Sequence, residues 1–193
     1  MKTKIFFPDM LYYIAVFLTA ISSTLIGATY LFLIPNFNPI VKYGALFFFC
    51  LYFLAVKWNR KGFIGTLFII IITFLCAFLI DNTTVLLYFL MIILAGKQNF
   101  NNICKFLIIT NLLLIFLIIV LCCIGILNDN VVVEGGKIAH SIGFAHYSTL
   151  AYHSLFFFII GYYLIEGKRK EAKKILWLLT GSCLNILVFK ITT

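Results

Sequence analysis

The sequence predicts an all-α fold, a polytopic bundle of helices that crosses a membrane several times. Hydrophobic residues account for 64% of the 193 residues and charged residues for only 11%, whereas charged residues make up about 25% of a soluble domain. The apolar residues form long uncharged segments, and each is predicted to be a helix because an open sheet edge is unstable in hydrocarbon. We therefore expect residues 1–193 to form a single integral membrane domain, a multi-pass protein of the cell membrane in contact with the lipid bilayer.

The first predicted span is the uncharged segment Met10–Ile34. It is longer than the apolar core of a signal peptide and lacks a small-residue cleavage site, so we expect it to be retained as a span. Pro35 and Pro39 should end this helix, because proline lacks a backbone N–H and disfavours the helical conformation of the residue before it.

Six further apolar segments predict six further spans, which gives seven in all. The weakest is the fourth, because its length at about 1.5 Å per residue covers only about 20 Å of a hydrocarbon core about 30 Å thick. This segment is expected to be short, tilted against its neighbours, or re-entrant. The six segments are Ile40–Val56, Phe63–Ile80, Thr83–Ala95, Phe106–Leu127, Ser148–Ile165 and Ile175–Phe189.

The distribution of Lys and Arg favours seven crossings. If all segments cross, twelve of the 15 cations lie on one side of the membrane, and the other side receives only Lys42, Lys137 and Lys190. A re-entrant Thr83–Ala95 would put the Lys168–Lys174 cluster and the N-terminal lysines on opposite sides, against the tendency of Lys and Arg to stay cytoplasmic. We therefore expect a cytoplasmic N-terminus, an external C-terminus and an external loop between the fifth and sixth spans.

Several function classes are disfavoured by the composition. The cations occur in short clusters between apolar segments, as topology signals do, so no nucleic-acid partner is expected. The six cysteines lie in or beside apolar segments without the spacing of a zinc or haem site, and we expect neither a metal nor another cofactor. No predicted span carries an ionisable residue at mid-depth, which disfavours an ion-coupled transporter.

The polar stretch that is best equipped for chemistry is Glu134–His153, which holds all three histidines. His140, His146 and His153 lack the four-residue spacing with which two histidines bind zinc from one helix, so a shared metal is not expected. Histidine can accept a proton near neutral pH, and Lys137 is the one fixed cation in the loop. From the residues alone, interfacial histidines without a catalytic role are the favoured interpretation, and general-base chemistry is the alternative.

Part of this stretch, Ile138-Ala-His-Ser-Ile-Gly-Phe-Ala-His146, resembles the signature of Wzy-type polymerases of bacterial surface polysaccharides. These enzymes are related to the O-antigen polymerase and ligase membrane glycosyltransferases. In that family an Arg and then a Leu-Gly-Phe-x-His-Pro-Asn run lead into a span at the outer membrane boundary. Ile142-Gly-Phe-Ala-His146 matches this run, whereas Ala139 or a neighbour stands where the family has its Arg, and Tyr147-Ser148 replaces Pro-Asn.

The resemblance implies a polymerase that elongates polyprenyl-diphosphate-linked oligosaccharide repeats of a bacterial surface polysaccharide at the outer membrane face. In such a reaction a sugar hydroxyl attacks an anomeric carbon and the lipid diphosphate leaves, which requires a base and a cation. His146 is the first candidate for the base or for substrate positioning, and His140 is the second. The candidate substrate-binding residues are Lys137, Gly143 and Phe144.

Members of the resembling family are commonly much longer than this chain. We therefore expect the N-terminal part of a larger polymerase, which works with other membrane proteins of polysaccharide assembly. The alternative is a non-catalytic multispanning protein, either an assembly subunit or a lipid-linked sugar transporter. In both cases we expect no β-sheet beyond a short ribbon in a loop.

Overall fold

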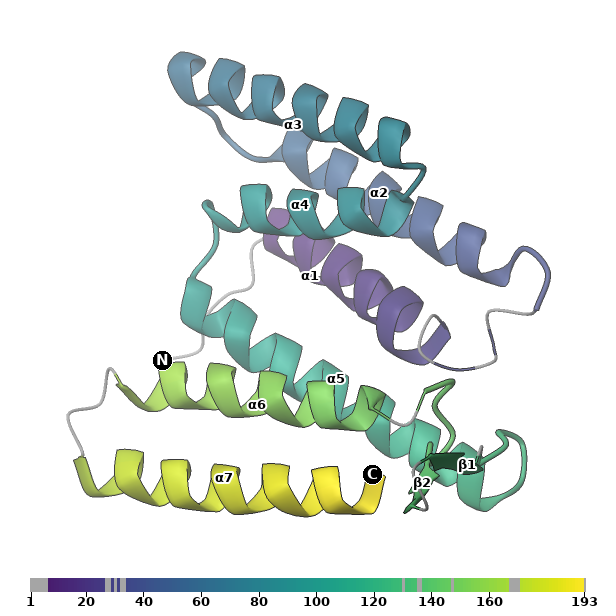
Figure 1. Cartoon of the computed structure of the whole chain (residues 1–193). Helices are drawn as coiled ribbons and strands as arrows, with labels where there is room; N and C mark the ends of the chain where they lie inside the picture. Colours follow the sequence, from purple (N-terminus) through teal and green to yellow (C-terminus); the bar gives the residue numbers. More distant parts are fainter. Residues whose placement is uncertain are drawn as a thin grey trace. The chain divides into compact units, whose positions relative to one another are not determined.

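The computed structural model describes residues 7–26, 29, 31, 34–129, 131–134, 137–146, 148–166 and 171–192. These residues form helices and one antiparallel ribbon of two strands between the fifth and sixth helices (Figure 1). The all-α prediction is therefore confirmed. In chain order the elements are α1 (Phe7–Ala20), the π-helix η1 (Ile21–Ile26), α2 (Phe37–Ala55), α3 (Arg60–Ile80), α4 (Thr83–Ala95), α5 (Phe100–Cys123), β1 (Val131–Glu134), β2 (Lys137–His140), α6 (Thr149–Glu166) and α7 (Glu171–Thr192).

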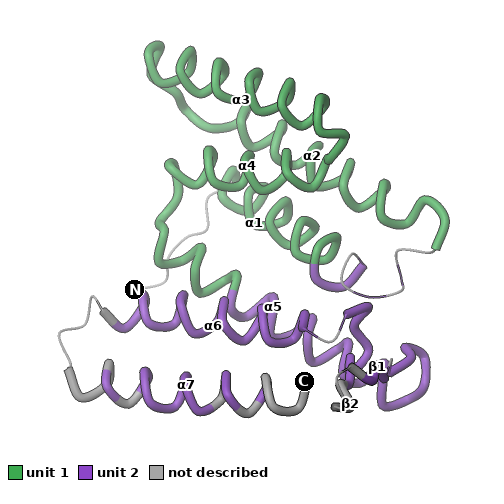
Figure 2. Tube along the Cα trace, viewed as in Figure 1, with its two compact units in different colours: residues 1–23, 34–107 green, residues 24–33, 108–193 purple. Residues whose placement is uncertain are grey.

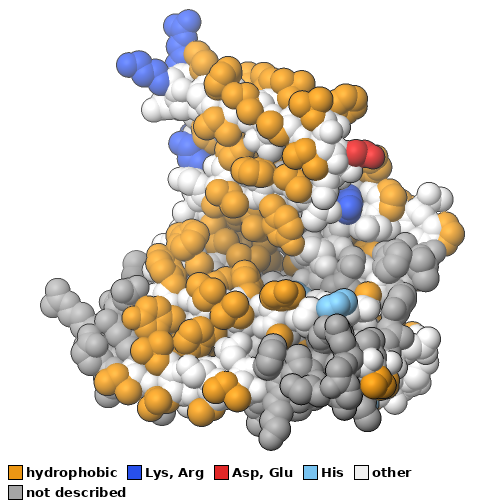
Figure 3. Space-filling model, in the orientation of Figure 1, with side chains coloured by type: hydrophobic (Ala, Val, Ile, Leu, Met, Phe, Trp, Pro, Cys, Tyr) orange, Lys and Arg blue, Asp and Glu red, His pale blue; other side chains and the backbone are white. Residues whose placement is uncertain are grey.

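Among the described residues, four helical segments have the length and hydropathy of membrane spans. The apolar segments Thr83–Ala95 and Thr149–Ile165 are shorter. Large apolar side chains are exposed along the helices, and Figure 3 shows hydrophobic side chains spread over the visible surface. Such a surface is suited to lipid, so the chain is a membrane protein, and the total of seven spans stays a prediction. The four segments are Phe7–Ile26, Phe37–Ala55, Arg60–Ile80 and Phe100–Cys123.

The structure reproduces the predicted bounds of Thr83–Ala95, and among the other predicted spans the bounds of the first and the fifth differ most from the structure. The first span begins at Phe7, becomes π-helical at Ile21, and its described helix ends at Ile26. The hydroxyl groups of Thr19 in α1 and Ser23 in η1 each donate to a carbonyl oxygen four residues earlier, a local competition that often bends helices. Helix α5 begins before Lys105, whose charge bounded the predicted segment, and it ends before Gly125, which has a positive φ of 78°.

The chain divides into two compact units, which Figure 2 colours separately. Unit 1 comprises residues 1–23 and 34–107, and unit 2 comprises residues 24–33 and 108–193. Each unit has its own cluster of buried apolar residues. The single series of spans in the sequence does not predict this division.

Tyr12 of α1 lies in the core of unit 1, where it has no exposed surface. Its ring contacts Phe49 and Tyr52 of α2, with centroid distances of 6.0 and 5.2 Å. Its hydroxyl donates to the carbonyl oxygen of Met91 in α4 over 2.9 Å, which satisfies a polar group that would be costly to bury alone. Helix α4 turns one apolar face into this core, because its buried leucines recur at helical spacing. They are Leu86, Leu87, Leu90 and Leu94.

The two ends of α4 lie at opposite ends of unit 1. At one end, the side-chain amide of Gln98, just after α4, donates to Asp9 (2.6 Å) and to the Tyr52 hydroxyl (2.9 Å). This cluster joins the start of α1 and the end of α2. At the other end, Tyr43 near the start of α2 and Thr83 at the start of α4 line the same pocket. Helix α4 therefore traverses unit 1 despite its 13 residues, and it does not turn back within the unit.

Helices α6 and α7 of unit 2 pack closely through two glycines. A side chain at Gly161 would overlap the Trp177 ring, and one at Gly181 would overlap the Phe158 ring. The indole N–H of Trp177 also donates to the carbonyl oxygen of Phe158 over 3.1 Å. The two aromatic rings thus occupy the space left by the glycine of the facing helix, which lets the helix backbones approach as small residues do in membrane proteins.

Candidate functional site

The candidate site lies in the segment 124–148 between α5 and α6, called the α5–α6 loop below. Strands β1 and β2 form its ribbon, in which Val131 pairs with His140 and Glu134 with Lys137. Three successive β-branched valines favour the strand, and the two-residue Gly-Gly connection in the sequence favours a tight hairpin. The ribbon brings residue 140 back to the beginning of the loop.

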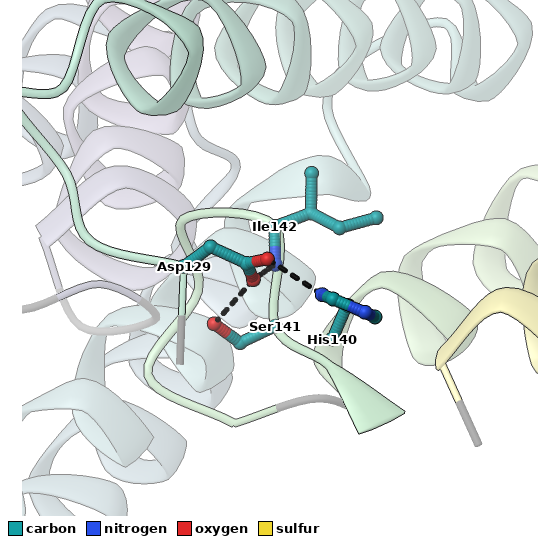
Figure 4. Close-up of polar contacts among 4 residues, drawn as sticks. All are labelled: Asp129, His140, Ser141 and Ile142. Atoms are coloured by element: carbon teal, nitrogen blue, oxygen red, sulfur yellow. Dashed lines mark hydrogen bonds and ion pairs between the residues drawn. The ribbon is translucent and has the colours of Figure 1, made fainter. Parts of the chain in front are cut away.

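Asp129 accepts hydrogen bonds from three consecutive residues at the end of the ribbon (Figure 4). Its carboxylate lies 2.7 Å from Nδ1 of His140 and 2.7 Å from the backbone nitrogen of Ile142. The Ser141 hydroxyl is a longer donor at 3.4 Å. The carboxylate therefore orients the His140 ring and at the same time closes the loop.

The electrostatic environment keeps Asp129 ionised. Partial burial acts to raise the pKa of its carboxyl group. The hydrogen bonds from His140 and Ile142 and the attraction to His140 together lower the pKa by more than burial raises it. The pKa of Asp129 therefore lies below its usual value. A carboxylate can only accept, so Nδ1 of His140 carries a proton and Nε2 holds the lone pair of the neutral ring. The side chains of His140 and Asp129 are 46% and 35% exposed, which leaves the pair accessible to a ligand.

Ile142 and Gly143 form a left-handed bend after the pair, with φ values of 49° and 81°. The bend points the Ile142 N–H at Asp129 and brings Gly143 against α5. A Cβ atom at Gly143 would lie 3.0 Å from Cβ of Cys122 and 3.3 Å from the carbonyl oxygen of Ile118. Glycine is therefore suited to this position by both its φ and its lack of a side chain.

Phe144 anchors the loop in the core of unit 2. It has no exposed surface and packs with Ile118 and Leu127, and its ring lies 5.9 Å from the ring of His153 in α6. The structure thus gives Gly143 and Phe144 a role in fixing the loop on α5. Their predicted contact with substrate stays a prediction.

His146 lies in a different environment from His140. Its Nδ1 is 2.7 Å from the Ser148 hydroxyl and 3.3 Å from the Ser148 backbone nitrogen. A backbone N–H can only donate, so Nδ1 is the acceptor and the neutral ring carries its proton on Nε2. His146 is therefore set up to donate through Nε2, whereas His140 is set up to accept there.

The remaining predicted residue, Lys137, begins β2 opposite Glu134. The position of its side chain lies outside the described structure, and its predicted role as a cation stays a prediction. Within the described residues, no group of three or more His, Cys, Asp or Glu side chains is placed to hold a metal ion.

Two contacts of the candidate site were missed from the sequence, those that Asp129 makes with His140 and that Ser148 makes with His146. Asp129 is the first carboxylate that precedes the ribbon in the sequence. A hairpin returns the chain toward its own start, and the Val-Val-Val and Gly-Gly pattern is typical of a hairpin. This pattern could therefore have predicted that Asp129 lies beside the end of the ribbon. Ser148 follows His146 by two residues, a spacing at which a hydroxyl reaches a neighbouring side chain.

Comparison with protein-family models, with curated proteins and with solved structures finds no match for this chain. The resemblance to polysaccharide polymerases therefore depends on the short motif ending at His146. The geometry around Asp129 and His140 is an independent observation.

Proposed function

We propose that the chain is a membrane glycosyltransferase-type polymerase, or part of one, that elongates polyprenyl-diphosphate-linked oligosaccharide repeats at the external membrane face. The observation that carries the proposal is the Asp129–His140 pair, in which a carboxylate 2.7 Å from Nδ1 orients an accessible imidazole. In the sequence, Ser141 alone separates His140 of this pair from Ile142-Gly-Phe-Ala-His146, the run that resembles the polymerase signature.

The pair is suited to activating a sugar hydroxyl. In the proposed step, Nε2 of His140 accepts the hydroxyl proton while the oxygen forms a bond to the anomeric carbon of the lipid-linked sugar. The bond from that carbon to the diphosphate oxygen breaks, and the lipid diphosphate leaves with the electron pair. Asp129 is a positioning residue, which holds the ring and stabilises the imidazolium that forms.

The geometry favours His140 over His146 as the base, which reverses the order that the sequence indicated. His146 would present Nε2–H to an anionic oxygen, so we assign it to substrate positioning. Lys137 is the proposed cation for charge that develops on the diphosphate.

The proposal includes seven crossings with a cytoplasmic N-terminus and a cell-membrane location. The distribution of lysine and arginine supports this topology. Two contacts within the units agree with it: Gln98 links the start of α1 to the end of α2, and α7 contacts β2. Alternating crossings put Gln98, the start of α1 and the end of α2 on one side of the membrane, and they put the C-terminal end of α7 on the same side as β2.

A non-catalytic subunit or lipid-linked sugar transporter is the second candidate. One observation favours it: Ala139 or a neighbour stands where the resembling family has its Arg, so charge stabilisation would depend on Lys137 in this chain. The two candidates predict different effects on polymerisation when the proposed base is removed.

The test uses a bacterial strain whose surface polymer requires this locus. Asp129→Asn and His140→Ala should each reduce polymerisation about 10²-fold or more, the usual contribution of a general base. Asp81→Asn changes another exposed carboxylate that is distant along the chain, and it should leave the polymer length unchanged. Normal polymer from well-expressed Asp129→Asn and His140→Ala variants would overturn the catalytic assignment and favour the non-catalytic candidate.

A further inference from the structure

Four apolar side chains of the α5–α6 loop are exposed although they lie outside the helices. Ile124 and Ile126 are 62% and 61% exposed, and Val131 and Val133 of β1 are 52% and 69% exposed. Exposed apolar groups gathered in one loop indicate a surface that contacts something apolar.

This surface continues the exposed side of a candidate membrane span. Leu113 and Phe116 of α5 are among the exposed apolar residues of that helix, and the helix ends at Cys123. Ile124 follows directly and Ile126 lies two residues beyond it. The apolar surface of α5 therefore extends into the loop without an intervening charged residue.

His140 lies on the same face of the ribbon as the two exposed valines. Val131 is the direct partner of His140 in the antiparallel register, and directly opposite residues lie on one face of a sheet. Val133 is two residues from Val131 and shares that face. We call this surface, carrying Val131, Val133 and His140, the ribbon face.

The carboxylate of Asp129, which contacts His140 of this face, already has hydrogen-bond donors. Asp129 is bound by donors from His140, Ser141 and Ile142, so approach to an apolar phase would not leave its charge without partners.

We infer that the ribbon face rests on the membrane at the depth of the lipid headgroups, with Val131 and Val133 inserted at the boundary of the acyl chains. The partner is the bilayer itself. His140 then meets groups that are carried at headgroup depth, so its ligand is held by a membrane lipid and approaches laterally. The inference goes beyond the proposed reaction, because the loop can rest on the bilayer whether or not the chain is catalytic.

The experiment measures the depth of a fluorescent amino acid placed at Val133 by amber suppression, in the full chain reconstituted into nanodiscs of phosphatidylethanolamine and phosphatidylglycerol. Nitroxide on the lipid headgroup should quench the probe strongly. Aqueous iodide should quench the probe at least about threefold less than it quenches the free fluorescent amino acid, because the acyl-chain boundary excludes water. A probe at Phe116 serves as the deep control and should respond to nitroxide on the acyl chain. Iodide quenching at Val133 equal to that of the free amino acid, without quenching by lipid nitroxide, would overturn the inference.

A second variant tests the cause of the shielding. With the probe at Ile126, the double change Val131→Asp and Val133→Asp should raise iodide quenching, because two carboxylates would lift the loop away from the acyl chains. Unchanged iodide quenching would mean that the valines do not hold the loop on the membrane. No polymer is measured in either arm, so a failure here is distinguishable from a failure of the proposed function.

Discussion

At the level of single residues, Gly143 meets two separate constraints in the α5–α6 loop. Its φ of 81° lies in the left-handed region, which costs a residue with a side chain about 1–2 kcal/mol. Its Cα also faces Cys122 and Ile118 so closely that a Cβ atom would lie 3.0 to 3.3 Å from them. The bend that turns the Ile142 N–H toward Asp129 depends on both conditions.

Gly143→Ala should therefore destabilise the protein by about 2–4 kcal/mol, the sum of backbone strain and crowding against α5. Gly125→Ala is a matched control, because Gly125 also has a positive φ of 78° but no atom within 4 Å of its Cβ position. We expect the unfolding free energy of the control variant to fall by only about 1–2 kcal/mol. The measurement is the unfolding free energy in detergent, followed by circular dichroism. Equal losses of unfolding free energy in the two variants would show that Gly143 lies farther from α5 than described.

At the level of elements, the α6–α7 hairpin is held by the reciprocal fit of aromatic rings and glycines. Trp177 lies over Gly161, Phe158 lies over Gly181, and the indole N–H of Trp177 bonds the carbonyl oxygen of Phe158. In lipid no hydrophobic effect drives two apolar helices together, so close packing and this hydrogen bond supply much of their attraction. The hairpin matters for the candidate site because α7 contacts β2.

Gly161→Ala should weaken the hairpin by about 1–3 kcal/mol, since the new methyl group forces the Trp177 ring out of place. Gly65→Ala provides the control, because its Cβ would meet no atom within 4 Å and alanine favours a helix by about 1 kcal/mol over glycine. Thermal denaturation in detergent compares the two variants. If Gly161→Ala were as stable as Gly65→Ala, the described contact between α6 and α7 would be wrong.

At the level of the whole molecule, the order of crossings decides which side of the membrane each loop faces. The short helix α4 is the critical element, because the side of every later loop changes if it does not cross. Its two ends lie at opposite ends of unit 1, near Gln98 and near Tyr43, which supports a crossing by a short helix.

A reporter fused after Gly167 should behave as cytoplasmic, and one fused after Lys137 as external. The expectation follows from the twelve cations that seven crossings gather on one side. Paired alkaline phosphatase and green fluorescent protein fusions at each site measure the location, because the two reporters are active on opposite sides. Cytoplasmic behaviour of the Lys137 fusion would mean that one of the first five segments does not cross, and Thr83–Ala95 would be the first to re-examine.

The sequence is sufficient to predict a helical membrane protein, because helix formation in lipid depends on local properties: apolar length, missing charge and the proline turn at Pro35–Pro39. It also allowed no β-sheet beyond a short ribbon in a loop, and it identified the loop that holds His140 and His146. Only the tertiary structure paired Asp129 with His140, since that contact depends on the return of the ribbon and on the left-handed bend at Ile142 and Gly143. The division into two units and the glycine–aromatic fit of α6 and α7 likewise arise from packing between distant segments, which helical periodicity along the chain does not encode.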